Sequence, residues 1–260
     1  MHYLNRSNKG FWPLAKKEVL NFRLKRIRDL EWSHTEDVLK SYSPGTFLDI
    51  GCGSGYAISK AHNLGFSAIG IDRQIGIRGV IASSWVMDSM IETLAEALPF
   101  KNDYVDVVYS SHALEHFSDR DLGLSEISRV LNPKGIAVIV VPTGTMAFVN
   151  LISQLLFTTH IRIGKFILKD RSLRALREIF LPRAHGSYQS SVIHEMRDFN
   201  IRNWKQLISN YFQINEVLSP GLYPYAIYPQ FFPYIQSSKF YSSIIFICKK
   251  KYMCVRVLDC

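Results

Sequence analysis

The feature that most constrains the fold of this chain is a glycine-rich turn that directly follows a short apolar run. The stretch reads FLDIGCGSGYA over residues 47–57, with glycine at Gly51, Gly53 and Gly55. Glycine at this density weakens a helix or strand by roughly 0.5–1 kcal/mol per residue relative to alanine, so these residues favour a turn that a ligand approaches closely. A strand, a glycine turn and a helix start form the unit with which α/β proteins hold nucleotides.

Apolar runs alternate with helical patterns on either side of this turn. We expect helices within 14–40 and at 56–65 and 121–135, and strands at 46–50, 67–72, 83–88, 106–111 and 136–142. Short, almost wholly apolar runs are typical of strands buried on both faces of a parallel sheet. The alternation therefore predicts an α/β fold with a doubly wound sheet. After residue 142 it breaks, and resumes only with a helix at 201–212 and strands at 213–220 and 242–250.

Acidic residues around the turn indicate which ligand it holds. Asp49 precedes the glycines, where a carboxylate repels a diphosphate and attracts an ammonium group, and the glycine spacing differs from that of dinucleotide-binding turns. Asp72 ends the second expected strand, where an acid can accept hydrogen bonds from ribose hydroxyls. Asp88 ends the third, with Ser89 and Met90 beside it, and could accept from an adenine amino group. Ammonium, ribose and adenine together describe S-adenosylmethionine.

The motifs LDIGCGSG, IGID, VMDSM, DVVYSSHALEHF and SRVLNPKGIAVIVVP resemble the successive motifs of class I S-adenosylmethionine-dependent methyltransferases, from about residue 44 to 142. The resemblance implies a Rossmann-like sheet of seven mostly parallel strands with the last strand antiparallel, N-terminal helices and a helical insertion after the fifth strand. It implies S-adenosylmethionine as cofactor. Cys52 is interpreted as a small turn residue and not as a nucleophile. The expected cofactor-binding residues are Asp49, Gly51, Cys52, Gly53, Asp72, Arg73, Asp88, Ser89 and Ser110.

The motifs also predict how the chain is divided into segments. We expect residues 1–43 to form a basic helical cap and residues 44–142 to form the cofactor-binding core. Residues 143–200 form a helical or loop insertion that serves as acceptor site or lid. Residues 201–250 complete the sheet, and 251–260 form a tail.

Candidate catalytic residues follow the fourth expected strand in SSHALEHF, where open α/β sheets bind ligands. They are His112, Glu115 and His116. The pattern is similar to the Glu-x-x-Glu-His of ubiquinone-biosynthesis O-methyltransferases, for which the family implies a metal-assisted role, but His112 replaces the first glutamate. Three interpretations stay open: the trio holds a divalent ion, His116 is a general base for a substrate hydroxyl, or His116 only orders the loop. We assign no metal.

The acceptor site is expected in the variable region after residue 142. His185, Tyr188 and His194 are candidate substrate-binding residues, and the aromatic stretch 221–235 could stack a planar acceptor. The apolar run 146–157 precedes a region, 160–185, with seven basic and two acidic residues. Such a sequence predicts an interfacial helix at an anionic membrane, or else a lid packed on the core with its basic face in water.

Charge and cysteine content limit the partners. The net charge is +9, and residues 1–30 carry eight basic and two acidic residues, which suits an anionic partner. The loop after the fourth strand lacks the Pro-Pro-aromatic signature of enzymes that methylate nucleobases, so nucleic acid is disfavoured, although RNA ribose methylation stays open. The four cysteines have no zinc spacing, and the N-terminal stretch lacks a signal-peptide core, so we expect a cytoplasmic protein that can contact a membrane peripherally.

The predicted function is methyl transfer from S-adenosylmethionine to a small-molecule, lipid or glycan acceptor, at oxygen. An RNA methyltransferase and a catalytically inactive S-adenosylmethionine-binding partner subunit remain as alternatives. The sequence predicts no oligomeric state.

Overall fold

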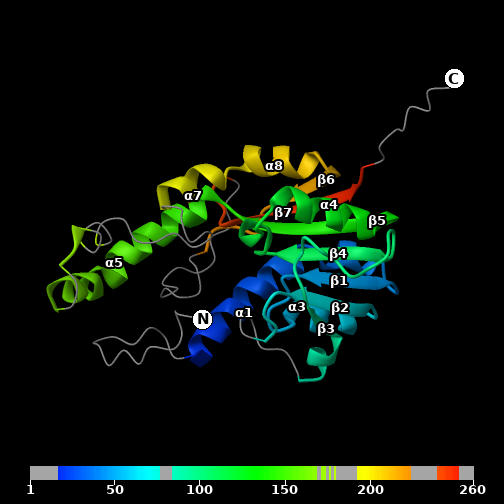
Figure 1. The fold of residues 1–260 in the computed structure, drawn as a ribbon, viewed down its shortest axis with the longest axis horizontal. Helices are drawn as coiled ribbons and strands as arrows, with labels where there is room; N and C mark the ends of the chain where they lie inside the picture. Colours follow the sequence, from blue (N-terminus) through cyan, green and yellow to red (C-terminus); the bar gives the residue numbers. More distant parts are fainter. Residues whose placement is uncertain are drawn as a thin grey trace.

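The computed structural model describes residues 17–76, 84–168, 192–223 and 239–251, together with 171–173, 176 and 179. Within them the chain forms a seven-stranded sheet in the order β3-β2-β1-β4-β5-β7-β6, with helices on both faces (Figure 1). The strands are β1 (Thr46–Ile50), β2 (Ser67–Asp72), β3 (Met90–Glu92), β4 (Val105–Ser111), β5 (Leu131–Pro142), β6 (Phe212–Leu218) and β7 (Ser243–Lys250).

The strand directions confirm the predicted fold. β7 runs antiparallel to both of its neighbours, β5 and β6, whereas the pairs from β3 to β5 are parallel. Parallel strands end at the same edge of a sheet, so the carboxyl ends of β1, β2 and β4 meet there. Ligands of open α/β sheets bind at this edge, which we call the carboxyl edge.

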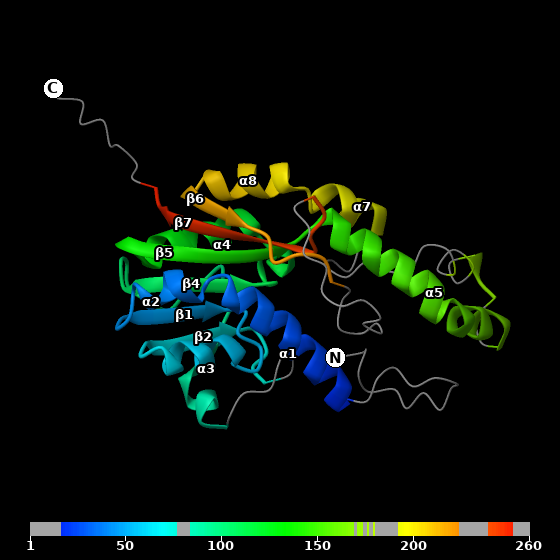
Figure 2. The same cartoon turned by 180° about the vertical axis from the view of Figure 1, so that it is seen from behind.

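Helices cover the sheet in two layers. α1, α2 and α3 pack on one face through Trp32, Leu39 and Ala61, against Phe47 and Tyr109 of the sheet. α4 and α8 pack on the other face (Figures 1 and 2). The helices are α1 (Lys17–Ser33), α2 (Glu36–Lys40), α3 (Tyr56–Asn63), α4 (Arg120–Val130), α5 (Gly144–Leu168), α7 (Val192–Asp198) and α8 (Ile201–Ser209), and two short 3₁₀ helices are η1 (Ser84–Ser89) and η2 (Leu114–His116).

Two helices extend beyond the carboxyl edge. α5 begins two residues after β5 ends and projects away from the sheet, with α7 packed along its first part (Figures 1 and 2). α1 extends past the same edge, and its last turns lie against the sheet (Figure 2). The carboxyl edge is therefore flanked by α1 and α5.

The structure corrects the third predicted strand. Residues 84–89 form η1, and the strand itself is the short β3 that follows. The apolar side chain of Val86 packs against Cys52 and Ile58, so this stretch covers the glycine turn and α3 instead of pairing in the sheet. As a result Asp88 precedes the third strand, and the prediction that it ends this strand is wrong.

Two predicted helix ends are also too late. The helix expected at 121–135 ends at Val130, because the backbone of Leu131 already pairs with Val105 of β4. The Asn132-Pro133 pair, interpreted as the helix stop, lies inside β5. The helix expected to reach residue 212 ends at Ser209, since Phe212 begins β6.

Candidate functional site

The glycine turn has no room for a side chain at Gly51 or Gly55. Gly51, Gly53 and Gly55 have φ of 76°, 55° and 83°, in the left-handed region that favours glycine. A Cβ added to Gly51 would lie 2.4 Å from the Cβ of Ala113, and one added to Gly55 would lie 2.3 Å from the terminal methyl carbon of Met90. At these two positions the turn is therefore bare backbone enclosed by neighbouring elements.

Asp72 holds this turn in place. One of its carboxylate oxygens accepts the backbone N–H of Gly53 at 2.9 Å, and the other accepts that of Gln74 at 2.9 Å. The N–H groups of Gly51 and Cys52 both donate to the carbonyl of Ile71 at 2.9 Å. Asp72, whose carboxylate is predicted to contact the ribose, thus also holds the backbone of the glycine turn in position. Arg73, the next residue, is exposed.

Asp49 is a buried carboxyl group just before the turn, with 4% of its surface exposed. Burial and the charge of Asp72 raise the pKa of Asp49 to about 8, although the charge of Arg28 acts in the opposite direction. A buried acid with a raised pKa favours a cationic ligand, because the cation stabilises the carboxylate form. Cys52 is buried beside it, and burial raises the pKa of its thiol, so it is a poor nucleophile.

The remaining predicted cofactor residues lie at different places. The Ser110 hydroxyl, near the end of β4, is buried and has no hydrogen-bond partner among the described residues. Asp88 is exposed and Ser89 partly exposed on η1, ahead of β3. A glycine-rich turn, a buried acid and an unsatisfied buried hydroxyl at one sheet edge fit a small polar ligand with an ammonium group. S-adenosylmethionine has that chemistry.

The loop after β4 brings the three predicted catalytic residues together. His112 has a φ of 52°, a conformation that costs a non-glycine residue on the order of 1–3 kcal/mol and is frequent at functional sites. Glu115 and His116 follow in η2. The Oε1 atom of Glu115 lies 3.6 Å from His112 Nδ1 and 4.0 Å from His116 Nε2. The carboxylate therefore stands between the two imidazoles.

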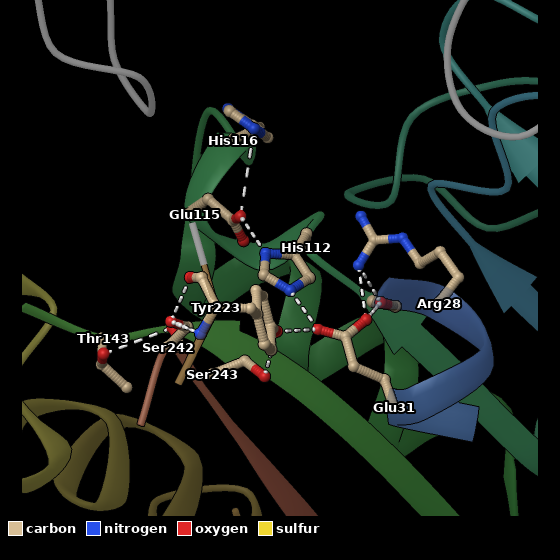
Figure 3. Close-up of polar contacts among 10 residues, drawn as sticks. Arg28, Glu31, His112, Glu115, His116, Thr143, Tyr223, Ser242 and Ser243 are labelled. Atoms are coloured by element: carbon tan, nitrogen blue, oxygen red, sulfur yellow. Dashed lines mark hydrogen bonds and ion pairs between the residues drawn. The ribbon is translucent and has the colours of Figure 1, made fainter. Parts of the chain in front are cut away.

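A fourth residue, Glu31 of α1, completes the group (Figure 3). Its side chain is fully buried, with 0% exposed. Its Oε1 lies 2.7 Å from His112 Nε2 and accepts the hydroxyl of Tyr223 at 2.5 Å. Its Oε2 accepts Nη1 of Arg28 at 2.6 Å, and the Tyr223 hydroxyl also lies 2.6 Å from Ser243 Oγ. The Glu31 carboxylate thus joins α1 to the loop after β4 and, through the Tyr223 hydroxyl, to the start of β7.

These contacts set the charges of the buried groups. Burial favours a neutral Glu31, but the charges of His112 and Arg28 outweigh it and hold the pKa of Glu31 well below its usual range. Burial lowers the pKa of His112, but the charge of Glu31 and the contacts with Glu115 and Glu31 together more than compensate, so this pKa is raised. The pKa of Glu115 is lowered despite burial, because His112 and His116 lie beside it. We infer an imidazolium held between two carboxylates.

This arrangement bears on the three interpretations of the trio. Within the described ranges, no group of three or more His, Cys, Asp or Glu side chains is placed to hold a metal ion. The His112 ring is engaged by Glu31 and Glu115, and only 9% of it is exposed. His116 is the most accessible of the three, with 27% of its side chain exposed. His116 is therefore the member best placed to meet a substrate.

Of the predicted acceptor residues, His194 falls within the part of the chain that the structure describes. His185 and Tyr188 lie outside the described residues, as does most of the aromatic stretch 221–235. His194 is exposed on α7, next to Glu195, which is buried.

Arg28, Glu31 and Tyr223 are not among the site residues that the sequence patterns predict. One signal was available for Glu31: it continues the 3–4 spacing of Leu20, Leu24 and Ile27 along α1, which marks the buried face of that helix. A carboxylate on a buried helix face needs partners, so this position could have been identified as part of a polar site.

Comparison with known proteins agrees with this geometry. Residues 48–139 match the model of a family described as "Methyltransferase domain". The chain is 28% identical over 185 residues to a ubiquinone biosynthesis O-methyltransferase of Chelativorans sp., an alignment that covers 65% of this chain and 72% of the relative. It is 36% identical over 94 residues to the protein of the same name from Brucella ovis, covering 35% of this chain and 38% of that relative.

A solved structure from Listeria monocytogenes, described as an S-adenosylmethionine-dependent methyltransferase, shares the fold with a TM-score of 0.52. The alignment covers 86% of this chain and 100% of that chain at 17% identity.

Proposed function

We propose that the chain is an S-adenosylmethionine-dependent methyltransferase that methylates a hydroxyl group of a small-molecule, lipid or glycan acceptor. The observation that carries this proposal is the partly exposed His116 beside a buried carboxylate at the carboxyl edge. The names of the O-methyltransferase relatives support it, at modest identity.

The cofactor supplies a methyl group that its sulfonium already activates, so the protein acts mainly by positioning. In the proposed complex the bare backbone of Gly51 and Gly53 admits the cofactor, Asp49 pairs with its ammonium group and Asp72 accepts from its ribose. The Ser110 hydroxyl is a further polar contact available at this edge. Asp88 and Ser89 stay candidates for the adenine, although η1 carries them ahead of β3.

His116 acts in this proposal as the general base that takes the acceptor's hydroxyl proton at an imidazole nitrogen. Glu115 has neither oxygen hydrogen-bonded within the described residues, and its Oε1 lies 4.0 Å from His116 Nε2. A buried carboxylate at this distance stabilises the imidazolium that forms on proton transfer. His112 is unsuited to the role, because its ring nitrogens face Glu31 and Glu115.

Replacing His116 with alanine is expected to lower the rate of acceptor-dependent S-adenosylhomocysteine release by roughly 100- to 10,000-fold, since a positioned base contributes about that much. The assay supplies lipid, glycan and RNA fractions separately as acceptors. Affinity for S-adenosylhomocysteine should not change. The control is His34→Ala, which removes a partly exposed histidine just after α1. Full activity of the His116 variant contradicts the base assignment.

The alternative functions have distinct outcomes in this assay. Methylation confined to the RNA fraction identifies an RNA methyltransferase. Binding of S-adenosylhomocysteine without turnover of any fraction points to an inactive partner subunit.

The exposed surface of α5 favours a lipid or membrane-borne acceptor among these classes. Phe148, Ile152, Leu156 and Ile163 are exposed along this helix. The helix contains no acidic residue. None of the described helices is long and apolar enough to span a membrane. An exposed apolar stripe with basic residues and no acids suits a helix lying on an anionic lipid surface.

Leu156→Glu is expected to weaken binding to vesicles of phosphatidylglycerol roughly tenfold or more, because it removes buried apolar area and adds a negative charge. Co-sedimentation at low salt measures the effect against phosphatidylcholine vesicles. The control is Leu122→Glu, at an exposed leucine of α4. Failure of the unmodified protein to bind anionic vesicles leaves α5 as a lid or as a surface for another partner.

A further inference from the structure

The short helix η2 carries the proposed base, and its backbone decides where that base lies. Glu115 is buried, yet neither of its carboxylate oxygens has a hydrogen-bond partner among the described residues. Within the turn, the N–H of His116 donates to the carbonyl of Ala113 at 2.8 Å. A 3₁₀ turn has poorer hydrogen-bond geometry than an α-helix, so a single one holds its shape weakly by itself. The positions of Glu115 and His116 therefore depend on contacts that hold η2 from outside.

Arg120, the first residue of α4, reaches back to this turn. Its Nη2 donates to the backbone carbonyl of Glu115 at 3.4 Å. Its Nη1 donates to the carboxylate of Asp198, the last residue of α7, at 3.1 Å. The guanidinium carbon lies 5.0 Å from the centre of the Trp204 ring, close enough for a cation to be attracted by the ring face. One side chain thus joins η2 to the end of α7 and to α8.

The aromatic partner of Arg120 belongs to a firmly packed junction. Trp204 is buried, and its Nε1 donates to the carbonyl of Pro142 at 3.0 Å. Its ring stacks on Phe199 with the centroids 5.7 Å apart. The N–H of Gly144, where α5 begins, donates to the carbonyl of Phe199 at 2.9 Å. Arg120 therefore ties η2 to the place where β5, α5, α7 and α8 meet.

The ion pair of Arg120 with Asp198 contributes little to overall stability. It is partly exposed, with 27% of the Arg120 side chain and 35% of the Asp198 side chain accessible. Ion pairs at such positions typically shift the folding equilibrium by a factor of about five or less. A reacting group that is misplaced by roughly 1 Å can lose about 100-fold in rate. The same contacts can therefore matter much more for rate than for stability.

We propose that Arg120 is a positioning residue, which fixes η2, and with it the imidazole of His116, relative to the base of α5 and α7. Arginine suits this role because its planar fork donates to Glu115 and Asp198 at the same time while its face lies on Trp204. Arg120 acts through the backbone of η2 and is assigned no contact with cofactor or acceptor. The effect on rate rests on the proposed function of His116, whereas the ordering of η2 does not.

Steady-state kinetics test the effect on rate, with whichever fraction, lipid, glycan or RNA, the unmodified protein methylates. Arg120→Gln should lower kcat by roughly 10- to 100-fold, while the KM for S-adenosylmethionine changes less than about twofold. The melting temperature should fall by less than about 5 °C. Arg120→Lys should recover part of the rate, because it keeps a positive charge beside Asp198 but cannot donate in both directions. Arg202→Gln is the control, since Arg202 is exposed on α8.

Hydrogen exchange tests the ordering of η2 without any acceptor. In Arg120→Gln the backbone amides of residues 113–117 should exchange roughly 10-fold faster, because the turn opens locally more often. The amides of β4 should exchange as in the unmodified protein. Arg202→Gln should leave both segments unchanged. Mass spectrometry of peptides from these segments measures the rates.

The outcomes separate this proposal from the assignment of His116. Unchanged exchange of residues 113–117 in Arg120→Gln overturns the proposal, and so does faster exchange with full activity. If the unmodified protein methylates no fraction, the proposed function fails, and the exchange rates alone support or overturn the anchor. If Arg120→Gln fails to fold, Asp198→Asn should show the same changes at smaller amplitude, because it removes the charged partner of Arg120. An Asp198 variant without either change then overturns the proposal.

Discussion

Gly51→Val should lower the affinity for S-adenosylhomocysteine by at least about 100-fold, or abolish binding, because the turn cannot hold a side chain there. A Cβ at this position would meet the Cβ of Ala113 at 2.4 Å, and the φ of 76° is strained for any residue with a Cβ, most of all a branched one. Relieving the clash moves the turn away from Asp49 and Asp72. Calorimetric titration with S-adenosylhomocysteine measures the loss.

Gly164→Val is the matched control for this substitution. A Cβ at Gly164 of α5 has no neighbour within 4 Å. We expect unchanged affinity there, with a small change in thermal stability. An unaffected Gly51 variant would show that the cofactor does not contact this turn.

Glu31→Gln should reduce the free energy of unfolding by roughly 3–5 kcal/mol, the range measured when one partner of a buried ion pair is removed. Glu31 is fully buried, and its carboxylate accepts from Arg28, His112 and Tyr223. Glutamine has one acceptor oxygen and no charge, so it leaves the guanidinium and the imidazolium without their counter-ion. Urea denaturation at neutral pH measures the change.

Other variants test whether the loss of stability in Glu31→Gln is due to the loss of the charge. Glu18→Gln, at an exposed position of the same helix, should change stability by less than about 0.5 kcal/mol. Tyr223→Phe, which removes one neutral donor to Glu31, should lose about 1 kcal/mol. Adding His112→Gln to the Glu31 variant should recover part of the loss, because it removes the unpaired imidazolium. A purely additive double variant contradicts the charge coupling.

The sequence alone predicts the strands that are marked by a local pattern of apolar residues and turn residues. β1 and β2 have the predicted bounds, 46–50 and 67–72, since each is a short apolar run closed by an acid or a glycine turn. The third strand was misplaced because Trp85, Val86 and Met87 look like a buried strand. Val86 packs on the glycine turn, whereas Trp85 and Met87 are exposed. Only tertiary packing distinguishes the two cases.

The candidate site likewise contains residues that local sequence predicts and residues that only the fold brings together. His112, Glu115 and His116 were identified because they lie within five positions of each other in one loop after a strand. Glu31 and Tyr223 are 192 residues apart and meet only in the folded chain. Arg28 and Asp29 lie in a charge-rich helix, where most charges face solvent. Which of these charges turn inward depends on the packing of α1 against the sheet, and a single sequence does not reveal it.

The position of β7 has a consequence for how the chain folds. β7 inserts between β5 and β6, so Pro142 pairs with Ser243 across a long intervening segment. Until residues 243–250 are synthesised, β5 has an open, apolar edge and β6 has no neighbour in the sheet. Closing the sheet is therefore a late, non-local step, of the kind that slows folding and exposes strand edges to aggregation. The buried hydrogen bonds that join Glu31, Tyr223 and Ser243 form only after this step, since they need residues 223 and 243 in place.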